Sequence, residues 1–234
     1  MKRLTGMVLM CGLLAGAQCQ AFMLGGLRAV YSQEAKAIEV PVFSGRSDKT
    51  YLIKATLLKD PESRTVVHNF LISPPLFRLE PGQRNNLRIS LIDPQGLPVD
   101  RESVFYLDVT GIPSSNPLAR GNHDGFSNGS VSFGTGNRIK FFYRPRGIPA
   151  PTAETYRQLT FSRIPGGVEV SNPTPYNMTL TTDLVDKRKV RKMIMVPPFG
   201  RERLPQVGAT SRNTLTWYAI DDNADVQSGK AAIR

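Results

Sequence analysis

Cysteine is scarce in this chain. Only two of the 234 residues are cysteines, Cys11 and Cys19. Both lie in an N-terminal segment in which a basic start precedes an apolar run over residues 7–15 and small residues up to Ala21. This pattern is typical of a secretory signal peptide, and we expect residues 1–21 to be removed by cleavage. The exported chain would then contain neither a disulfide nor a thiolate nucleophile, so ordinary hydrophobic cores must hold it together.

Acidic residues are few relative to basic ones. The chain has 19 Asp and Glu against 30 Lys and Arg, a net charge of +11. Removing the leader takes away Lys2 and Arg3 and leaves +9, that is, 11 minus 2. Such a surface favours acidic partners, nucleic acid or anionic lipid. The densest basic run, KRKVRK at 187–192, lacks an accompanying aromatic stacking pattern, so we interpret it as a solvated loop or a protected strand edge and expect no nucleic-acid partner.

Beyond the leader, the sequence has no apolar run long enough to cross a bilayer and no long segment with a period of 3.6 residues. We therefore expect no membrane insertion and little helix. Segments of strand-like composition recur instead, separated by turn residues at the spacing of β-sandwiches. These segments are residues 37–43, 51–58, 87–91, 104–109, 139–143, 167–170, 178–184 and 214–220. The sequence thus predicts an all-β protein.

One stretch indicates a boundary between two domains. Residues 144–152 read RPRGIPAPT, with three prolines and a glycine between strand-like regions. Proline cannot donate to a sheet ladder and stiffens a connection. We expect a first domain over residues 22–145, a hinge over 146–152 and a second domain over 153–234. A further irregular stretch, residues 113–130, is long for a hairpin loop.

Constellations of catalytic residues are missing. His68 and His123 lack the spacing of metal ligands. Asp221 and Asp222 are adjacent, so in a strand their carboxylates would point to opposite faces. No nucleophile elbow, phosphate-binding loop or dinucleotide-binding glycine motif is present. We therefore expect no enzymatic activity, no metal site and no cofactor.

Five segments, taken together and in order, carry a resemblance to a known family. They are LRAVY at 27–31, LISPPLFRLEPGQRNNLRI at 71–89, LPVDRESVFYLDV at 97–109, RIKFFYRP at 138–145 and SNPTPYNMTL at 171–180. With the leader in front of them, the chain resembles the PapD-like periplasmic chaperones of chaperone–usher pilus assembly. The resemblance covers essentially the whole exported chain. It implies two immunoglobulin-like β-sandwich domains in a boomerang arrangement.

The resemblance also implies a function. A PapD-like chaperone in the periplasm binds, folds and caps a pilus or fimbrial subunit whose own sandwich lacks its last strand. The last strand of the first chaperone domain fills the gap by donor-strand complementation. The subunit then passes to an outer-membrane usher. Whether the free chaperone hides its donor strand in a self-capping dimer, and which branch of the family this chain represents, stay open.

The expected donor strand begins with Val131 and Phe133, which alternate with small residues as pairing with a partner's edge requires. By the resemblance, Thr135 stands where the family usually has another large apolar residue. This implies that the donor strand inserts a smaller side chain into the subunit at that position. Without the resemblance, packing of Val131 and Phe133 inside their own domain is the simpler interpretation.

Two cations match the family's binding cleft. By resemblance, Arg28 and Lys140 together anchor the C-terminal carboxylate of the subunit, and charge-assisted hydrogen bonds suit that role. In an uninterrupted strand, however, Lys140 has the opposite parity to Val131 and Phe133 and faces the other way. A bulge near residues 134–136 or a strong strand twist would reconcile the two roles, and the sequence leaves both alternatives open.

Three further charges match the family's inter-domain cluster, which by resemblance fixes the angle between the domains. They are Glu102, Arg144 and Asp222. Asp222 departs from the pattern, because its segment reads IDDNA where the family is nearer to INDYG. Two functions from other classes are alternatives to the chaperone. An exported immunoglobulin-like adhesion or binding module would need no cationic cleft, and an exported hydrolase would need a nucleophile and base that the chain lacks.

Overall fold

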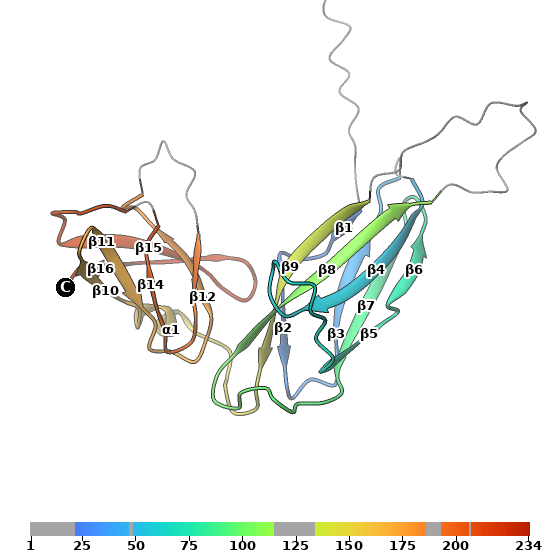
Figure 1. The fold of residues 1–234 in the computed structure, drawn as a ribbon, viewed down its shortest axis with the longest axis horizontal. Helices are drawn as coiled ribbons and strands as arrows, with labels where there is room; N and C mark the ends of the chain where they lie inside the picture. Colours follow the sequence, from blue (N-terminus) through green and yellow to red (C-terminus); the bar gives the residue numbers. More distant parts are fainter. Residues whose placement is uncertain (1–21, 47–48, 115–133, 186–192, 206) are drawn as a thin grey trace, which may run out of the picture.

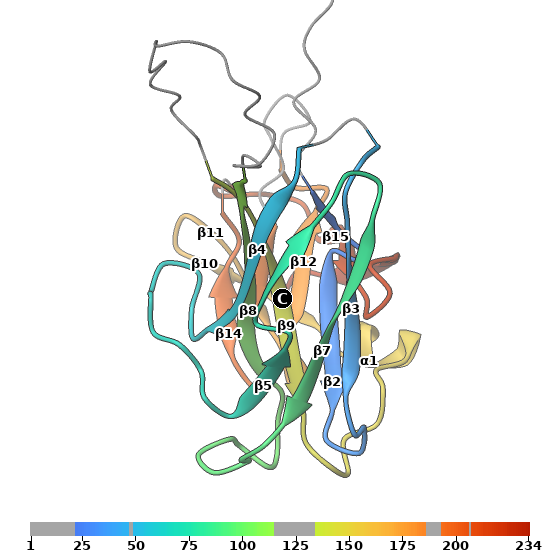
Figure 2. The same cartoon turned by 90° about the vertical axis from the view of Figure 1, so that its right-hand side faces the viewer.

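The computed structural model describes residues 22–46, 49–114, 134–185, 193–205 and 207–234. Within these ranges the protein is built almost entirely of β-strands arranged in two sandwich domains, and Figures 1 and 2 show them from two directions. The predicted all-β class is confirmed. Among the described residues, no helix has the length and apolar character that crossing a membrane requires. The leader, Val131, Phe133, His123 and the basic run at 187–192 lie outside the described residues.

The first domain consists of two sheets packed face to face. One sheet has the strand order β1-β3-β7-β5 and the other β2-β9-β8-β4-β6. Their bounds are β1 (Met23–Leu24), β2 (Arg28–Ser32), β3 (Ile38–Phe43), β4 (Tyr51–Leu58), β5 (Phe70–Ser73), β6 (Leu76–Leu79), β7 (Arg84–Leu91), β8 (Ser103–Pro113) and β9 (Thr135–Arg144).

Alternation of side chains explains this sandwich. In β4, Tyr51, Ile53 and Ala55 are buried while Leu52 and Lys54 are exposed, the two-residue period of a half-buried strand. The buried sides of both sheets meet in one core, in which the ring of Phe70 packs edge to face against that of Phe141. The core includes Tyr31, Phe70, Leu87, Leu107, Phe141 and Tyr143.

The second domain is a smaller sandwich with one short helix. Its sheets have the orders β10-β11-β14 and β13-β12-β15-β16. The bounds are α1 (Ala153–Arg157), β10 (Thr160–Ile164), β11 (Gly167–Ser171), β12 (Met178–Thr182), β13 (Ile194–Val196), β14 (Arg201–Arg203), β15 (Thr214–Ile220) and β16 (Val226–Ala232). A separate core fills it, built on Phe161, Val168, Leu180 and Trp217, so each domain has its own hydrophobic centre.

The two domains are set at an angle and joined at one end by the segment that follows β9 (Figure 1). Strand β9 is the part of the first domain that matters most for the site. It pairs with β8 in an unbroken antiparallel register from Ser103 opposite Tyr143 to Gly111 opposite Thr135. On its other side it pairs in parallel with β2, which sets Arg28 opposite Lys140.

Candidate functional site

The cations Arg28 and Lys140 lie side by side on β2 and β9, and both reach across to the second domain. The Arg28 guanidinium donates to the carbonyl oxygen of Ile220 at 3.1 Å. The Lys140 ammonium donates to the hydroxyl of Thr179 at 2.9 Å. Neither cation forms an ion pair with any carboxylate of the described residues. The structure therefore brings two positive charges together without neutralising them.

The surroundings of these cations disfavour their charge. Burial lowers the pKa of Lys140, and the neighbouring charge of Arg28 lowers it further. Burial also lowers the pKa of Arg28, although Asp222 and Asp221 favour its charged form. A partly desolvated cation without a counterion gains most from an anionic ligand, because such a ligand restores the interaction that water has lost. The charge and burial of the pair therefore suit a small anion such as a carboxylate.

The faces of β9 explain how Lys140 reaches this place. Phe141 and Tyr143 point into the core of the first domain. Lys140, Phe142 and Arg144 alternate with them, so they belong to the opposite face, which meets the second domain. The proposed bulge is wrong for the described part of the strand, because the register with β8 is continuous. Lys140 enters the cleft because it lies on the face opposite to the core.

Thr135, the first residue of β9, belongs to the core face of the strand. Its side-chain oxygen is buried and has no hydrogen-bond partner. Two residues later, the Asn137 side chain donates to the carbonyl oxygen of Phe22 at 2.9 Å. The core face thus becomes more polar toward this end of the strand, where the chain enters β9 after Val131 and Phe133.

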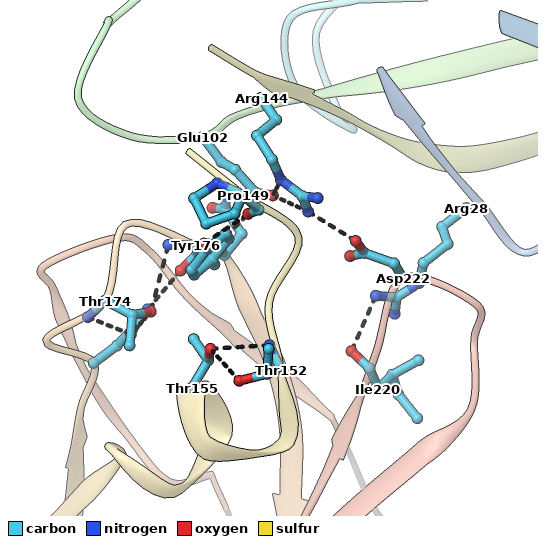
Figure 3. A network of polar contacts seen from close by, with 12 residues as sticks. Arg28, Glu102, Arg144, Pro149, Thr152, Thr155, Thr174, Tyr176, Ile220 and Asp222 are labelled. Carbon is cyan, nitrogen blue, oxygen red and sulfur yellow. Dashed lines mark hydrogen bonds and ion pairs between the residues drawn. The ribbon is translucent and has the colours of Figure 1, made fainter. Parts of the chain in front are cut away.

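Glu102, Arg144 and Asp222 form one cluster across the two domains (Figure 3). The Arg144 Nη2 atom donates to Glu102 at 2.6 Å and to Asp222 at 2.9 Å, while Nε donates to Glu102 at 2.9 Å. The side chains of Arg144 and Glu102 are only 6% and 3% exposed, which makes this a buried ion pair. Burial alone would lower the pKa of Arg144, but the two carboxylates raise it above its usual value.

Backbone groups complete the cluster from the second domain. The Asn177 N–H donates to Glu102 at 3.0 Å, and the Glu102 N–H donates to the carbonyl oxygen of Pro175 at 2.8 Å. Arg144 also lies over the ring of Tyr176 at 5.3 Å, and the Tyr176 hydroxyl donates to the carbonyl oxygen of Pro149 in the hinge (Figure 3). The cluster therefore joins the first domain, the hinge and the second domain.

The sequence did not reveal several residues of the cleft. The hydroxyl of Thr179 and the carbonyl oxygen of Ile220 accept the hydrogen bonds of Lys140 and Arg28. Tyr156 of α1 lies near Arg28, and burial raises the pKa of the Tyr156 hydroxyl. A hydroxyl or a carbonyl at such positions has no sequence signature, because its role depends on how the second domain is placed. The nearest available signal is the position of Thr179, three residues after the NPTPY segment that ends at Tyr176.

The fold and the cleft define a two-domain β-sandwich protein with two adjacent cations between its domains. Two family models match the chain: "Pili and flagellar-assembly chaperone, PapD N-terminal domain" over residues 21–149 and "Pili assembly chaperone PapD, C-terminal domain" over residues 154–230. The chain belongs to the PapD family of pilus-assembly chaperones. This confirms the family, the two-sandwich architecture and a chaperone rather than an enzymatic function.

Individual relatives agree with this membership. The probable fimbrial chaperone protein ElfD of Escherichia coli K12 is 33% identical over 221 residues, covering 94% of this chain and 89% of its own. The chaperone protein FocC of Escherichia coli is 32% identical over 199 residues, covering 85% of this chain and 84% of its own.

Solved structures show the same fold. The periplasmic chaperone SfaE is similar with a TM-score of 0.71 and 26% identity, over 91% of this chain and all of that one. The SafB chaperone of Salmonella enterica, solved in complex with the SafA pilin, has a TM-score of 0.74 at 22% identity, over 91% of this chain and 96% of the matched chain. The latter likeness concerns the fold alone.

Proposed function

We propose that this chain is a periplasmic chaperone that binds a pilus or fimbrial subunit in the cleft between its domains and holds the subunit's C-terminal carboxylate between Arg28 and Lys140. The observation that carries the proposal is the pair of adjacent, partly buried cations without a carboxylate partner among the described residues. The two cations now make hydrogen bonds to a neutral carbonyl and a neutral hydroxyl. A carboxylate can replace these weaker contacts with two charge-assisted ones.

Strand β9 supports a second part of the proposal, which is donor-strand complementation. A chain anchored at Lys140 and running along β9 would reach Thr135 and then the segment with Val131 and Phe133. Strand β9 pairs with β2 only from Lys140 to Arg144, so on that side its main chain from Thr135 to Ile139 can pair with a subunit that lacks a strand. Main-chain pairing gives such a complex affinity, and the alternate side chains give it specificity.

The proposal includes the remaining organisation of the chain. Residues 1–21 direct export and are removed, residues 22–145 form the subunit-binding domain, and residues 146–152 act as hinge before the second domain at 153–234. The capped subunit passes to an outer-membrane usher.

In the free chaperone, a second copy of the chain could cover the donor strand, and size-exclusion chromatography of the purified protein would detect that dimer.

Co-expression with a subunit from the same operon tests the function. Without its chaperone, a subunit that lacks a strand exposes its core and aggregates. We expect the wild-type chain to recover soluble subunit from the periplasm, and Arg28→Ala and Lys140→Ala to recover at least ten-fold less, because each removes a charge-assisted contact worth about 1.5–3 kcal/mol.

Lys36→Ala serves as the matched control, since Lys36 is an exposed lysine in the loop between β2 and β3. It should recover as much subunit as the wild-type protein. If Arg28→Ala and Lys140→Ala also recover wild-type amounts, the carboxylate anchor is refuted. The chaperone function would then stand without that anchor. Only a wild-type chain that recovers no soluble subunit would favour an exported binding module without chaperone activity.

A further inference from the structure

A turn of the second domain contains a residue in an unfavourable backbone conformation. The turn Pro197–Gly200 connects β13 with β14 and is closed by the Gly200 N–H, which donates to the carbonyl oxygen of Pro197 at 3.1 Å. Phe199, at the third position, has a φ of 55°. A turn with proline second and a positive φ third normally takes glycine or asparagine at the third position, because other side chains are strained there. A phenylalanine at this point needs a compensating contact.

The contact comes from the first domain. The guanidinium carbon of Arg101 lies 5.1 Å from the centre of the Phe199 ring, the arrangement of a cation–π interaction. Arg101 belongs to the connection between β7 and β8, and Asp100 orients it through two hydrogen bonds of 3.0 Å and 2.7 Å. The Phe199 residue is 50% exposed, so burial in a core does not account for its presence.

The neighbouring backbone confirms that the two domains touch here. The Phe199 N–H donates to the carbonyl oxygen of Thr174 at 3.1 Å. One residue further on, the carbonyl oxygen of Pro175 accepts from the N–H of Glu102, the residue that follows Arg101. The turn, the loop before Tyr176 and the end of the β7–β8 connection are therefore linked beside the buried charge cluster.

We infer that Asp100, Arg101 and Phe199 form a latch that fixes the angle between the domains. The strained φ of Phe199 is retained because it presents the ring to Arg101, which glycine could not do. The latch acts at a distance from the cleft, so its members are positioning residues. By holding the second domain, they keep the cleft beside Arg28 and Lys140 at one width, and this preorganises it for a ligand.

The test uses the variants Phe199→Gly and Arg101→Ala. Phe199→Gly removes the ring and also relieves the strain, so the fold should be as thermally stable as wild type or more so. A purely structural role for Phe199 would predict the opposite. Arg101→Ala keeps the turn intact and removes only the cation.

Domain orientation is measured as the distance distribution between spin labels on cysteines introduced at Lys36 and Lys230, which are exposed residues of the two domains. The cysteines of the chain, Cys11 and Cys19, both precede residue 22, so labelling of the processed protein is specific. Both variants should broaden the distribution. Arg84→Ala is the matched control, because Arg84 lies over Phe43 at 5.2 Å within the first domain alone. It should leave the distribution unchanged.

A second measurement, which rests on the proposed function, is the affinity for a peptide with the C-terminal sequence of the subunit recovered by co-expression. We expect both latch variants to bind it two- to five-fold more weakly, the factor that corresponds to an exposed cation–π contact. Distributions as narrow as that of Arg84→Ala would overturn the latch. Broadened distributions support it, whereas a wild-type chain that does not bind the peptide at all would count against the proposed function instead.

Discussion

Lys140 is placed where a lysine costs the fold free energy. Burial and the adjacent Arg28 both lower its pKa, and its only described hydrogen-bond partner is the hydroxyl of Thr179. Binding sites often retain such unfavourable groups, because the interaction that would compensate them is made by the ligand. For Arg28 and Lys140, the compensating ligand is the proposed carboxylate. The cost in the free chaperone should therefore be measurable.

We predict that Lys140→Met stabilises the free protein at about pH 7 by about 0.5–2 kcal/mol, the usual gain when a functional but unfavourable group is replaced. The folded-state pKa lies below the unfolded value of 10.5, so the unfolded chain binds the proton more tightly. The cost of the charge is complete below the folded-state pKa and disappears as the pH rises through it toward 10.5. The advantage of the variant should therefore shrink as the pH approaches 10.5.

Urea unfolding of both proteins across this pH range measures the effect. Lys36→Met, which changes an exposed lysine, provides the control and should differ little from wild type at either end of the range. A Lys140→Met protein that is less stable than wild type at neutral pH would show that the lysine contributes to the fold rather than to a ligand.

Strand β9 serves two neighbours through its two faces. One face, with Phe141 and Tyr143, completes the core of the first domain, and the other carries Lys140 and Arg144 to the second domain. This division is a consequence of the two-residue period of a regular strand. Thr135 lies on the core face, at the end where the strand leaves the packed interior.

We predict that Thr135→Val raises the free energy of unfolding by about 1 kcal/mol. The Thr135 hydroxyl oxygen is buried without a partner, so removing it at nearly constant volume relieves a desolvation penalty. Thr110→Val, on the adjacent strand β8, is the matched control. It should lower stability, because the Thr110 hydroxyl donates to Asp108 at 3.3 Å. Chemical denaturation of the two variants under identical conditions decides between them, and a destabilised Thr135→Val would mean that this hydroxyl is satisfied in solution.

The same strand illustrates what sequence can and cannot predict. Strand-like composition indicated a strand over residues 139–143, and the described strand is longer, from Thr135 to Arg144. Its polar start, with Gly136, Asn137 and Arg138, has little strand propensity and is held by the ladder with β8 instead. Counting along the sequence shows on which face of the strand Lys140 lies. It does not show what that face contacts, because this depends on where the second domain is placed.

At the scale of the whole molecule, the arrangement of the domains depends on contacts that converge near the hinge. Glu102, Arg144 and Asp222 were predicted as a cluster from a family resemblance, and the structure brings them within hydrogen-bond distance. No sequence motif indicated the contact between Arg101 and Phe199, because it depends on the positive φ of Phe199, which only the structure shows. Composition and turn spacing predicted an all-β chain with two domains, and the resemblance implied that both are sandwiches, whereas the contacts that hold the domains at their angle join residues distant in sequence.

A last prediction concerns the buried charge pair that spans this junction. Replacing Glu102 by alanine leaves Arg144 buried with only Asp222 as counter-charge, and Asp222 is 32% exposed. Removing one partner of a buried ion pair costs about 3–5 kcal/mol, because the remaining charge is left uncompensated. We expect Glu102→Ala to lose stability in this range. Glu154→Ala, which breaks an exposed pair with Arg157 on α1, should cost less than about 1 kcal/mol.

The loss of stability expected for Glu102→Ala can be assigned to one of the two domains. Trp217 is the single tryptophan and lies in the core of the second domain, so its fluorescence reports the unfolding of that domain, while circular dichroism reports both. In the wild-type protein the contacts around Arg144 should make the two transitions coincide. In Glu102→Ala they should separate, because Glu102 also accepts the Asn177 N–H of the second domain. Coincident transitions in the variant, with a loss no larger than that of Glu154→Ala, would show that the charge cluster does not couple the domains.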